Sequence, residues 1–335
     1  MDSLTHIALG ACIGEAFAGK KLGKKAMLWG ALMQSIPDID FIAGAWLNTS
    51  ENLLAHRGFT HSFLFALIIA PLLAMLAERW HRPHNITLRK WIFFFATEIF
   101  VHLFLDGFNA YGTGWFEPFS HKRFSLNTIF VADPFFSVWT GIAFLMLLII
   151  KRYNKSRRFW WRFGVFVPAC YLLYCCINKV KINADVRNAF TENQISYKRY
   201  FTTPTPLNNF LWYAVAESDS GFYIVYRSVF DKTTGISFQF FPRNEYLLHN
   251  VSDHEELQRL KRFSKGFYTA ELKNGTLVFN DLRFGQIAGW QDPKATFTFH
   301  YYLQHPDNSL VIQRGRFEGW NKKTFASFIQ RIKGN

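Results

Sequence analysis

The stretch DPFFSVWTGIAFLMLLII at residues 133–150 decides the class of fold. It carries no charged side chain after Asp133. A helix of about 20 apolar residues is long enough to cross the hydrocarbon core of a bilayer. The stretch therefore predicts a membrane-spanning helix. Composition agrees, because 50% of the 335 residues are hydrophobic and 38 are phenylalanine, which is too apolar for an ordinary soluble protein.

Further apolar segments extend this prediction over the first half of the chain. Two of them are short but have the aromatic flanks that are typical of membrane interfaces, and the first two contain polar groups. The expected segments besides 133–150 are residues 4–18, 26–46, 61–77, 91–105 and 163–177. We therefore expect residues 1–180 to form an α-helical polytopic membrane domain of about six helices.

The basic residues alternate between loops in a way that predicts the topology. Fourteen lysines and arginines lie in the connections that follow the first, third and fifth segments, whereas loops 47–59 and 107–132 hold Arg57, Lys122 and Arg123. Basic residues favour the cytoplasmic side, so both termini are expected outside the cytoplasm. The net charge of +14 then reflects topology. We expect a multi-pass protein of the plasma (inner) membrane in contact with the lipid bilayer, and no nucleic-acid partner.

Residues 181–335 have the pattern of a small α+β domain, which the topology places outside the cytoplasm. Asn274-Gly275 lies between two apolar runs and predicts a tight hairpin. Ser252 and Glu255 have the spacing of a capping box at the start of a helix. The expected elements are strand pairs within 210–230, 268–284 and 296–317, the last around Pro306, Asp307 and Asn308, and helices at 252–263 and 321–333.

Histidine and aspartate side chains gather at the predicted outer ends of the membrane helices. His102 and Asp106 have the i,i+4 spacing that places both on one helix face. Ionisable groups at membrane depth are costly and usually functional, and imidazoles with carboxylates bind borderline divalent cations. We therefore interpret His56 and His61 as metal ligands near the outer face. The constellation consists of His6, Asp38, Asp40, His56, His61, His102, Asp106 and Asp133.

Each part of this constellation also has a structural explanation. A histidine near a helix end is often an interfacial residue, and PDID at 37–40 is compatible with a simple turn. His102 and Asp106 are compatible with a hydrogen-bonded pair. Glu98, one turn before His102, is either a ligand or a partner that orients the imidazole. The topology rests on Lys and Arg and the cluster rests on His and Asp, so their agreement favours the metal site.

Several ordered motifs resemble those of a known family. MDSLTH at the N-terminus, PDID at 37–40, HRGFTHS at 56–62 and HLFLD at 102–106 resemble the YdjM-like family of membrane-bound proteins, which are regarded as metal-dependent hydrolases. That family is thought to be distantly similar to zinc-dependent phospholipase C. The resemblance implies these metal ligands: His6, Asp38, His56, His61, His102 and Asp106.

The expected function is therefore that of a metal-dependent hydrolase. We expect it to act on a phosphoester of a lipid or lipid-linked substrate at the outer leaflet. The cofactor is a divalent metal, with Zn²⁺ as the first expectation and Mn²⁺ as the second. Asp40 is expected to accept the proton of the attacking water. Basic residues on the same side are candidates for binding a phosphate or anionic head group, and equally for interfacial anchors: Arg57, His121, Lys122 and Arg123.

Two other classes of function remain open from the sequence. Intramembrane His and Asp also serve ion pathways, so a metal or ion transporter is one alternative. A non-catalytic membrane scaffold is the other. Clustering of the ligands at one face, with no inverted repeat in the sequence, argues against the transporter.

Overall fold

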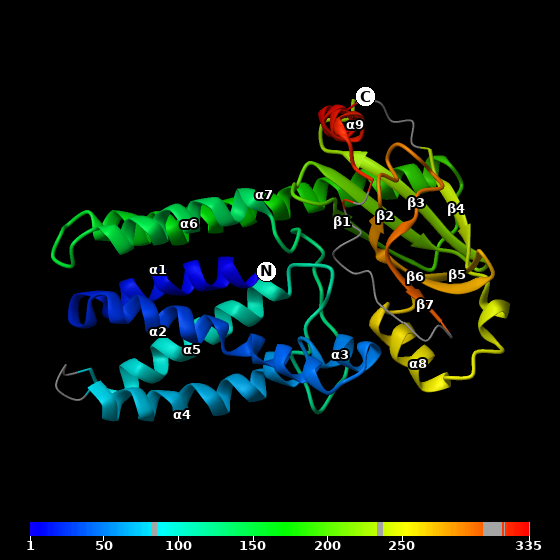
Figure 1. Ribbon diagram of the computed structural model, residues 1–335. Coiled ribbons are helices and arrows are strands. Elements are labelled where there is room, and N and C mark those ends of the chain that lie inside the picture. The colour runs from blue at the N-terminus through cyan, green and yellow to red at the C-terminus, as the bar shows by residue number, and fades with distance from the viewer. Residues whose placement is uncertain (82–85, 233–236, 304–316, 318, 335) are drawn as a thin grey trace. The chain divides into compact units, whose positions relative to one another are not determined.

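The computed structural model describes residues 1–81, 86–232, 237–303, 317 and 319–334 (Figure 1). The chain divides into two compact units, one of residues 1–45 and 55–175 and the other of residues 46–54 and 176–335. The predicted turn at Pro306, Asp307 and Asn308 lies outside the described residues, as does the strand expected after it.

Helices form at all six segments that were predicted to cross the membrane. Among the described residues, two helices are long and apolar enough to span by length and composition, namely α4 and α7, whereas α6 is apolar but shorter. The number of crossings therefore stays a prediction. The six helices are α1 (Ser3–Leu22), α2 (Lys24–Ser35), α4 (Phe63–His81), α5 (Leu88–Asp106), α6 (Pro134–Ile149) and α7 (Arg157–Glu192).

The second predicted segment, 26–46, is not one helix. α2 ends at Ser35, and Pro37–Ala45 forms the 3₁₀ helix η1. Pro37 has no backbone N–H to continue the α-helical hydrogen bonds, and it disfavours helical geometry in the residue before it. The break places Asp38 and Asp40 outside α2, in the tighter 3₁₀ turns that follow its end.

Glycines bring α1 and α2 into direct backbone contact. A Cβ atom on Gly10 would lie 2.4 Å from the Gly30 carbonyl oxygen, and one on Gly30 would lie 2.0 Å from the Gly10 carbonyl oxygen. Small residues permit such close packing between membrane helices. His6 and Gln34 lie one turn further along α1 and α2 from this contact.

Apolar side chains hold α5 against α4. The buried face of α4 is a stripe of small residues, and the aromatic face of α5 packs into the same core. Small residues opposite large ones allow two helices to interdigitate without voids. These residues are Ala66, Ala70, Ala74 and Ala77 on α4, and Trp91, Phe94, Phe95 and Ile99 on α5. α5 also packs against α2, as Figure 1 shows, so it lies at the centre of this unit.

A buried ion pair connects α1 with the start of α7. The guanidinium of Arg157 donates to both carboxylate oxygens of Glu15, at 2.8 and 2.6 Å. The side chains are only 4% and 7% exposed. Arg157 also donates to the carbonyl oxygens of Leu147 and Ile150. The pair explains why α1 carries an acidic residue within an apolar sequence.

The described residues of the second unit form two antiparallel sheets that share an apolar core. The first sheet has the order β1-β2-β3-β4 and the second β5-β6-β7. Val215 and Phe222 of the first sheet pack with Leu282 and Phe297 of the second. The strands are β1 (Arg199–Pro204), β2 (Leu211–Glu217), β3 (Gly221–Ser228), β4 (Gln239–Pro242), β5 (Tyr268–Lys273), β6 (Thr276–Gln286) and β7 (Phe297–Tyr302).

Short helices complete this unit: α3 (Thr49–Ala55), η4 (Glu245–Leu248), α8 (His254–Phe263) and α9 (Lys322–Lys333). The predictions of an α8 helix and of the β2–β3 and β5–β6 hairpins are confirmed. At the β5–β6 turn both Asn274 and Gly275 have positive φ, at 52° and 79°, as an Asn-Gly turn requires. The capping-box prediction for α8 is wrong, because the side chain that caps this helix is Asp253, which accepts from the Glu256 N–H.

Candidate metal centre

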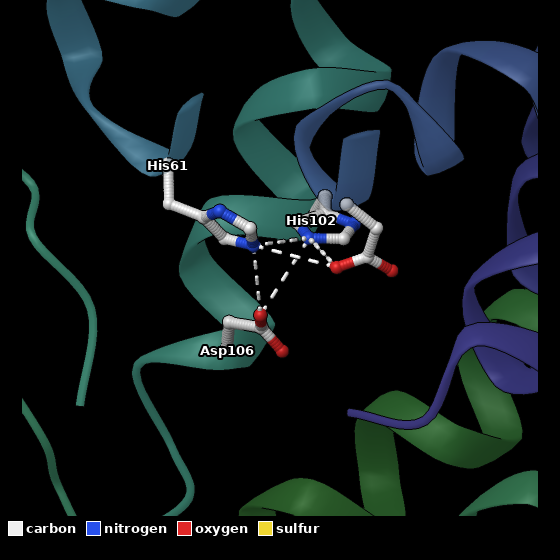
Figure 2. Close-up of side chains that lie close together, drawn as sticks. His61, His102 and Asp106 are labelled. Atoms are coloured by element: carbon white, nitrogen blue, oxygen red, sulfur yellow. Dashed lines mark hydrogen bonds and ion pairs between the residues drawn. The ribbon is translucent and has the colours of Figure 1, made fainter. Parts of the chain in front are cut away.

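Four side chains from three elements of the first unit converge on one point. Asp38 comes from η1, His61 from η2 (Phe59–His61), and His102 and Asp106 from the end of α5. One potential ligand atom from each residue lies within 4.8 Å of the other three. Figure 2 shows the His61 and His102 rings turned towards the Asp106 carboxylate.

The spacing of these atoms fits a single small cation. Nε2 of His61 lies 3.1 Å from Nε2 of His102, 3.3 Å from Asp106 Oδ2 and 3.5 Å from Asp38 Oδ1. Nε2 of His102 lies 3.5 Å from Asp106 Oδ2 and 3.6 Å from Asp38 Oδ1. With metal–ligand bonds of 2.0–2.2 Å, the ligand atoms of a tetrahedral zinc site lie about 3.3 Å apart. The donor set and its spacing therefore fit a divalent metal.

Three of the four side chains are buried, so the cluster is open to solvent on one side only. The side chains of His61, His102 and Asp106 are fully buried, whereas that of Asp38 is 19% exposed. Solvent therefore reaches the cluster at Asp38. A site closed to solvent on all sides is typical of structural metals, whereas a catalytic metal keeps an accessible position.

A backbone carbonyl orients His102. Its Nδ1 lies 2.6 Å from the carbonyl oxygen of Gln34, so Nδ1–H donates and the Nε2 lone pair points to the cluster. Glu98 does not orient His102, because neither of its buried carboxylate oxygens has a hydrogen-bond partner among the described residues. The Gln34 carbonyl takes the position that was expected for Glu98 as the orienting partner.

Asp40 holds the loop that carries His61. Its Oδ2 accepts from the Arg57 N–H at 2.7 Å and from the Thr60 hydroxyl at 3.2 Å, and it lies 3.3 Å from His61 Nδ1. Its Oδ1 lies 3.1 Å from His56 Nδ1. A carboxylate on the far nitrogen of a histidine fixes the ring orientation and makes the near nitrogen a better ligand.

The remaining predicted ligands lie around the cluster. His6 Nε2 is 3.3 Å from Asp106 Oδ1, and the His6 ring stacks on His102 with centroids 3.9 Å apart. The Met1 ammonium group also pairs with Asp106 Oδ1. His56 contacts Asp40 and is 41% exposed. The structure thus brings together Asp38, His61, His102 and Asp106, places His6 beside them, and places His56 behind Asp40.

The basic residues predicted to bind substrate separate into two groups. Arg57 is buried and its Nε lies 3.2 Å from Asp106 Oδ2. His121 pairs instead with Glu117, and the Lys122 ammonium lies over the Phe124 ring. Arg123 donates to the carbonyl oxygen of His56. Arg57 thus contacts Asp106 of the cluster, whereas these contacts of the other three residues are made outside the cluster.

The contacts that three residues of this region make were not predicted from the sequence. Gln34 acts through its backbone carbonyl, which every residue possesses, so its side chain gives no signal. Thr60 lies within the HRGFTHS motif, and its hydroxyl contacts both Asp40 and His61 Nδ1. Asn109 accepts a hydrogen bond from Arg57. Its position three residues after Asp106 was the available signal.

Two long apolar helices and a buried His and Asp cluster are the features expected of a membrane protein with a candidate metal-binding site. The sequence model described as YdjM inner membrane protein matches residues 1–182. The chain belongs to this family, and the resemblance stated from the motifs is confirmed.

Two relatives are similar to parts of the chain. Inner membrane protein YbcI of Escherichia coli (strain K12) is 32% identical over 123 residues, which cover 36% of this chain and 69% of YbcI. Uncharacterized protein YfhP of Bacillus subtilis (strain 168) is 32% identical over 173 residues, which cover 45% of this chain and 51% of YfhP. The chain thus spans about half the length of YfhP. No solved structure matches the chain.

Proposed function

We propose that this protein is a membrane-embedded, metal-dependent hydrolase that cleaves a phosphoester of a lipid or lipid-linked substrate. The observation that carries the proposal is the cluster of Asp38, His61, His102 and Asp106, whose donor atoms have the spacing of a metal site. Mixed imidazole and carboxylate ligands suit zinc first and manganese second. The lipid-linked substrate follows from the location of the cluster in the apolar helical unit.

We propose a distinct role for each residue in and around the cluster. Asp38, His61, His102 and Asp106 would hold the ion, which would lower the pKa of a coordinated water towards 7 and polarise a phosphoryl oxygen. The partly exposed Asp38 marks the side from which the substrate enters. The proton acceptor predicted from sequence was Asp40. Because both of its oxygens accept hydrogen bonds within the loop, we propose that Asp40 positions His61 instead.

The Asp40→Asn variant discriminates between the two roles of Asp40, proton acceptor and positioning partner of His61. An amide keeps the shape but is a poorer acceptor for His61 Nδ1–H, so metal affinity is expected to fall about 10–100-fold, as for other lost orienting partners. The measurement is a metal titration by competition with a chelator. Retention of wild-type metal affinity with loss of turnover would restore Asp40 as the proton acceptor.

A reconstitution assay tests the reaction itself. The purified chain, stripped with chelator and reloaded with Zn²⁺ or Mn²⁺, is incubated with phospholipids and polyprenyl phosphates, and released phosphate or head group is measured. We expect turnover that requires metal and is lost in His61→Ala. His121→Ala is the matched control, since this histidine is 63% exposed and pairs with Glu117. No turnover of any of these substrates by the metal-loaded wild type would contradict the proposal.

The topology is proposed from the distribution of basic residues. Lys24 is placed in the cytoplasm, and the second unit is placed outside as an extracytoplasmic domain. Both Lys24 and Asp219 are exposed. In a variant without the four native cysteines, Asp219→Cys is expected to react with an impermeant thiol reagent on intact cells, and Lys24→Cys only after permeabilisation. The opposite pattern would invert the assignment.

One observation favours a second candidate function, the transport of an ion. Glu98 lies one helical turn from His102 on α5, fully buried, and its carboxylate oxygens have no hydrogen-bond partner among the described residues. Unpaired ionisable groups inside membrane helices often belong to ion pathways. Zinc flux into liposomes that Glu98→Gln abolishes would favour transport. Absence of both zinc flux and hydrolysis would favour the third class, a non-catalytic membrane scaffold.

A further inference from the structure

Arg57 has a backbone conformation that its surroundings impose. Its φ is +60°, in the left-handed region that is strained for a non-glycine residue. Its N–H donates to Asp40 Oδ2 at 2.7 Å, and its carbonyl oxygen accepts from the Gly114 N–H at 2.9 Å. Conformations of this kind persist where neighbouring contacts enforce them, and they concentrate at functional sites.

This conformation directs the guanidinium group towards the metal cluster. Nε lies 3.2 Å from Asp106 Oδ2, NH1 donates to Asn109 Oδ1 at 2.7 Å, and the group lies 5.2 Å from the centre of the Tyr111 ring. Arg57 is only 4% exposed. Its planar group is therefore held beside a metal ligand, away from bulk water, where a charge-assisted hydrogen bond to a ligand is strong.

Asn109 supplies a second donor whose orientation is determined. Its Oδ1 accepts from both Arg57 NH1 and the Tyr111 N–H, the latter at 3.0 Å, so the amide cannot be rotated by half a turn without losing both bonds. Its Nδ2 is buried and has no acceptor among the described residues, and Asn109 is 1% exposed. A buried donor without an acceptor is unfavourable, and a ligand oxygen that accepts a hydrogen bond from it would remove this cost.

We propose that Arg57 and Asn109 form a subsite that binds the phosphoryl group next to the metal cluster. The inference rests on the proposed function, of which it specifies the substrate-binding part. The guanidinium lies beside Asp106 and bonds to Asn109 through NH1, and phosphoryl oxygens are suitable acceptors for the N–H groups of both side chains. His121 and Lys122, which the sequence also suggested, are not part of this subsite.

Binding of inorganic phosphate to the purified, zinc-loaded full chain tests the subsite by calorimetry. Arg57→Gln is expected to weaken phosphate binding about 100-fold, which corresponds to two charge-assisted contacts. Lys122→Gln is the matched control and is expected to bind as the wild type does. The metal content of each variant is measured first, so that loss of phosphate binding is not confused with loss of the ion.

A comparison in two backgrounds separates a ligand-binding role of Asn109 from a structural one. Asn109→Ala removes the Nδ2 donor and adds no charge. In the Arg57→Gln background it is expected to keep zinc and to weaken phosphate binding by about a further tenfold. If Asn109 only positions Arg57, Asn109→Ala would cause no further loss in that background, and the subsite would be disproved. Arg57→Lys, which keeps the charge, replaces Arg57→Gln if the latter does not fold.

A second arm identifies the source of the phosphoryl group. Detergent micelles that contain a phosphatidic acid are titrated into the phosphate complex. Displacement of phosphate assigns the subsite to a lipid-borne group, and phosphate binding without displacement assigns it to a soluble phosphate. Absence of phosphate binding by the wild type would overturn the subsite. Phosphate binding with the expected variant pattern but no ester hydrolysis would overturn only the proposed function.

Discussion

Replacing His61 or His102 with alanine is expected to remove the bound divalent ion from the protein. Each change deletes one of four ligand atoms that lie 3.1–3.6 Å from their neighbours. The loss of affinity should exceed the roughly 10–100-fold cost of losing an orienting partner, because a metal–ligand bond itself is lost. Elemental analysis after dialysis against a metal-buffered solution measures the effect.

Two controls make this result specific. His121→Ala removes an exposed imidazole outside the cluster and should retain the wild-type metal content. Glu98→Gln should also retain it, since the Gln34 carbonyl and not Glu98 orients His102. If His61→Ala and His102→Ala both keep the wild-type metal content, the cluster is not the metal site.

Breaking the Glu15–Arg157 pair is expected to produce the largest loss of stability in the helical unit. Arg157→Gln leaves the Glu15 carboxylate buried without its bidentate partner, and removal of one member of a buried ion pair costs about 3–5 kcal/mol. It also removes the donors to the Leu147 and Ile150 carbonyl oxygens. Thermal unfolding in detergent, followed by circular dichroism, measures the change.

A double variant shows whether the pair itself is responsible. Glu15→Gln with Arg157→Gln removes both charges, so it should recover part of the stability that the single variants lose. Asp219→Asn is the control, because its pair with Lys198 is exposed on both sides and should leave the unfolding temperature unchanged. Equal destabilisation by the single and double variants would assign the effect to the lost carbonyl contacts.

Local features of the second unit were predictable because neighbouring residues determine them. Asn274-Gly275 adopts positive φ at both positions with little strain, so the β5–β6 turn follows from two residues. The capping of α8 was misjudged because Ser252 and Asp253 are both good caps, and sequence spacing alone does not rank them. The end of α2 was predictable as well, because Pro37 opens the backbone there even though the apolar run continues beyond the proline.

The sequence by itself determined the kinds of residue in this protein and their order. It determined apolar segments, the His and Asp residues near their ends, and a strand-rich second half, because hydrophobic periodicity and residue chemistry are local properties. Only the tertiary structure decided which ligands meet. η1 and η2 bring Asp38 and His61 to α5, and the Gly10–Gly30 contact brings the Gln34 carbonyl to His102. These contacts join segments that are far apart in the chain, and a local sequence pattern does not encode the distances between such segments.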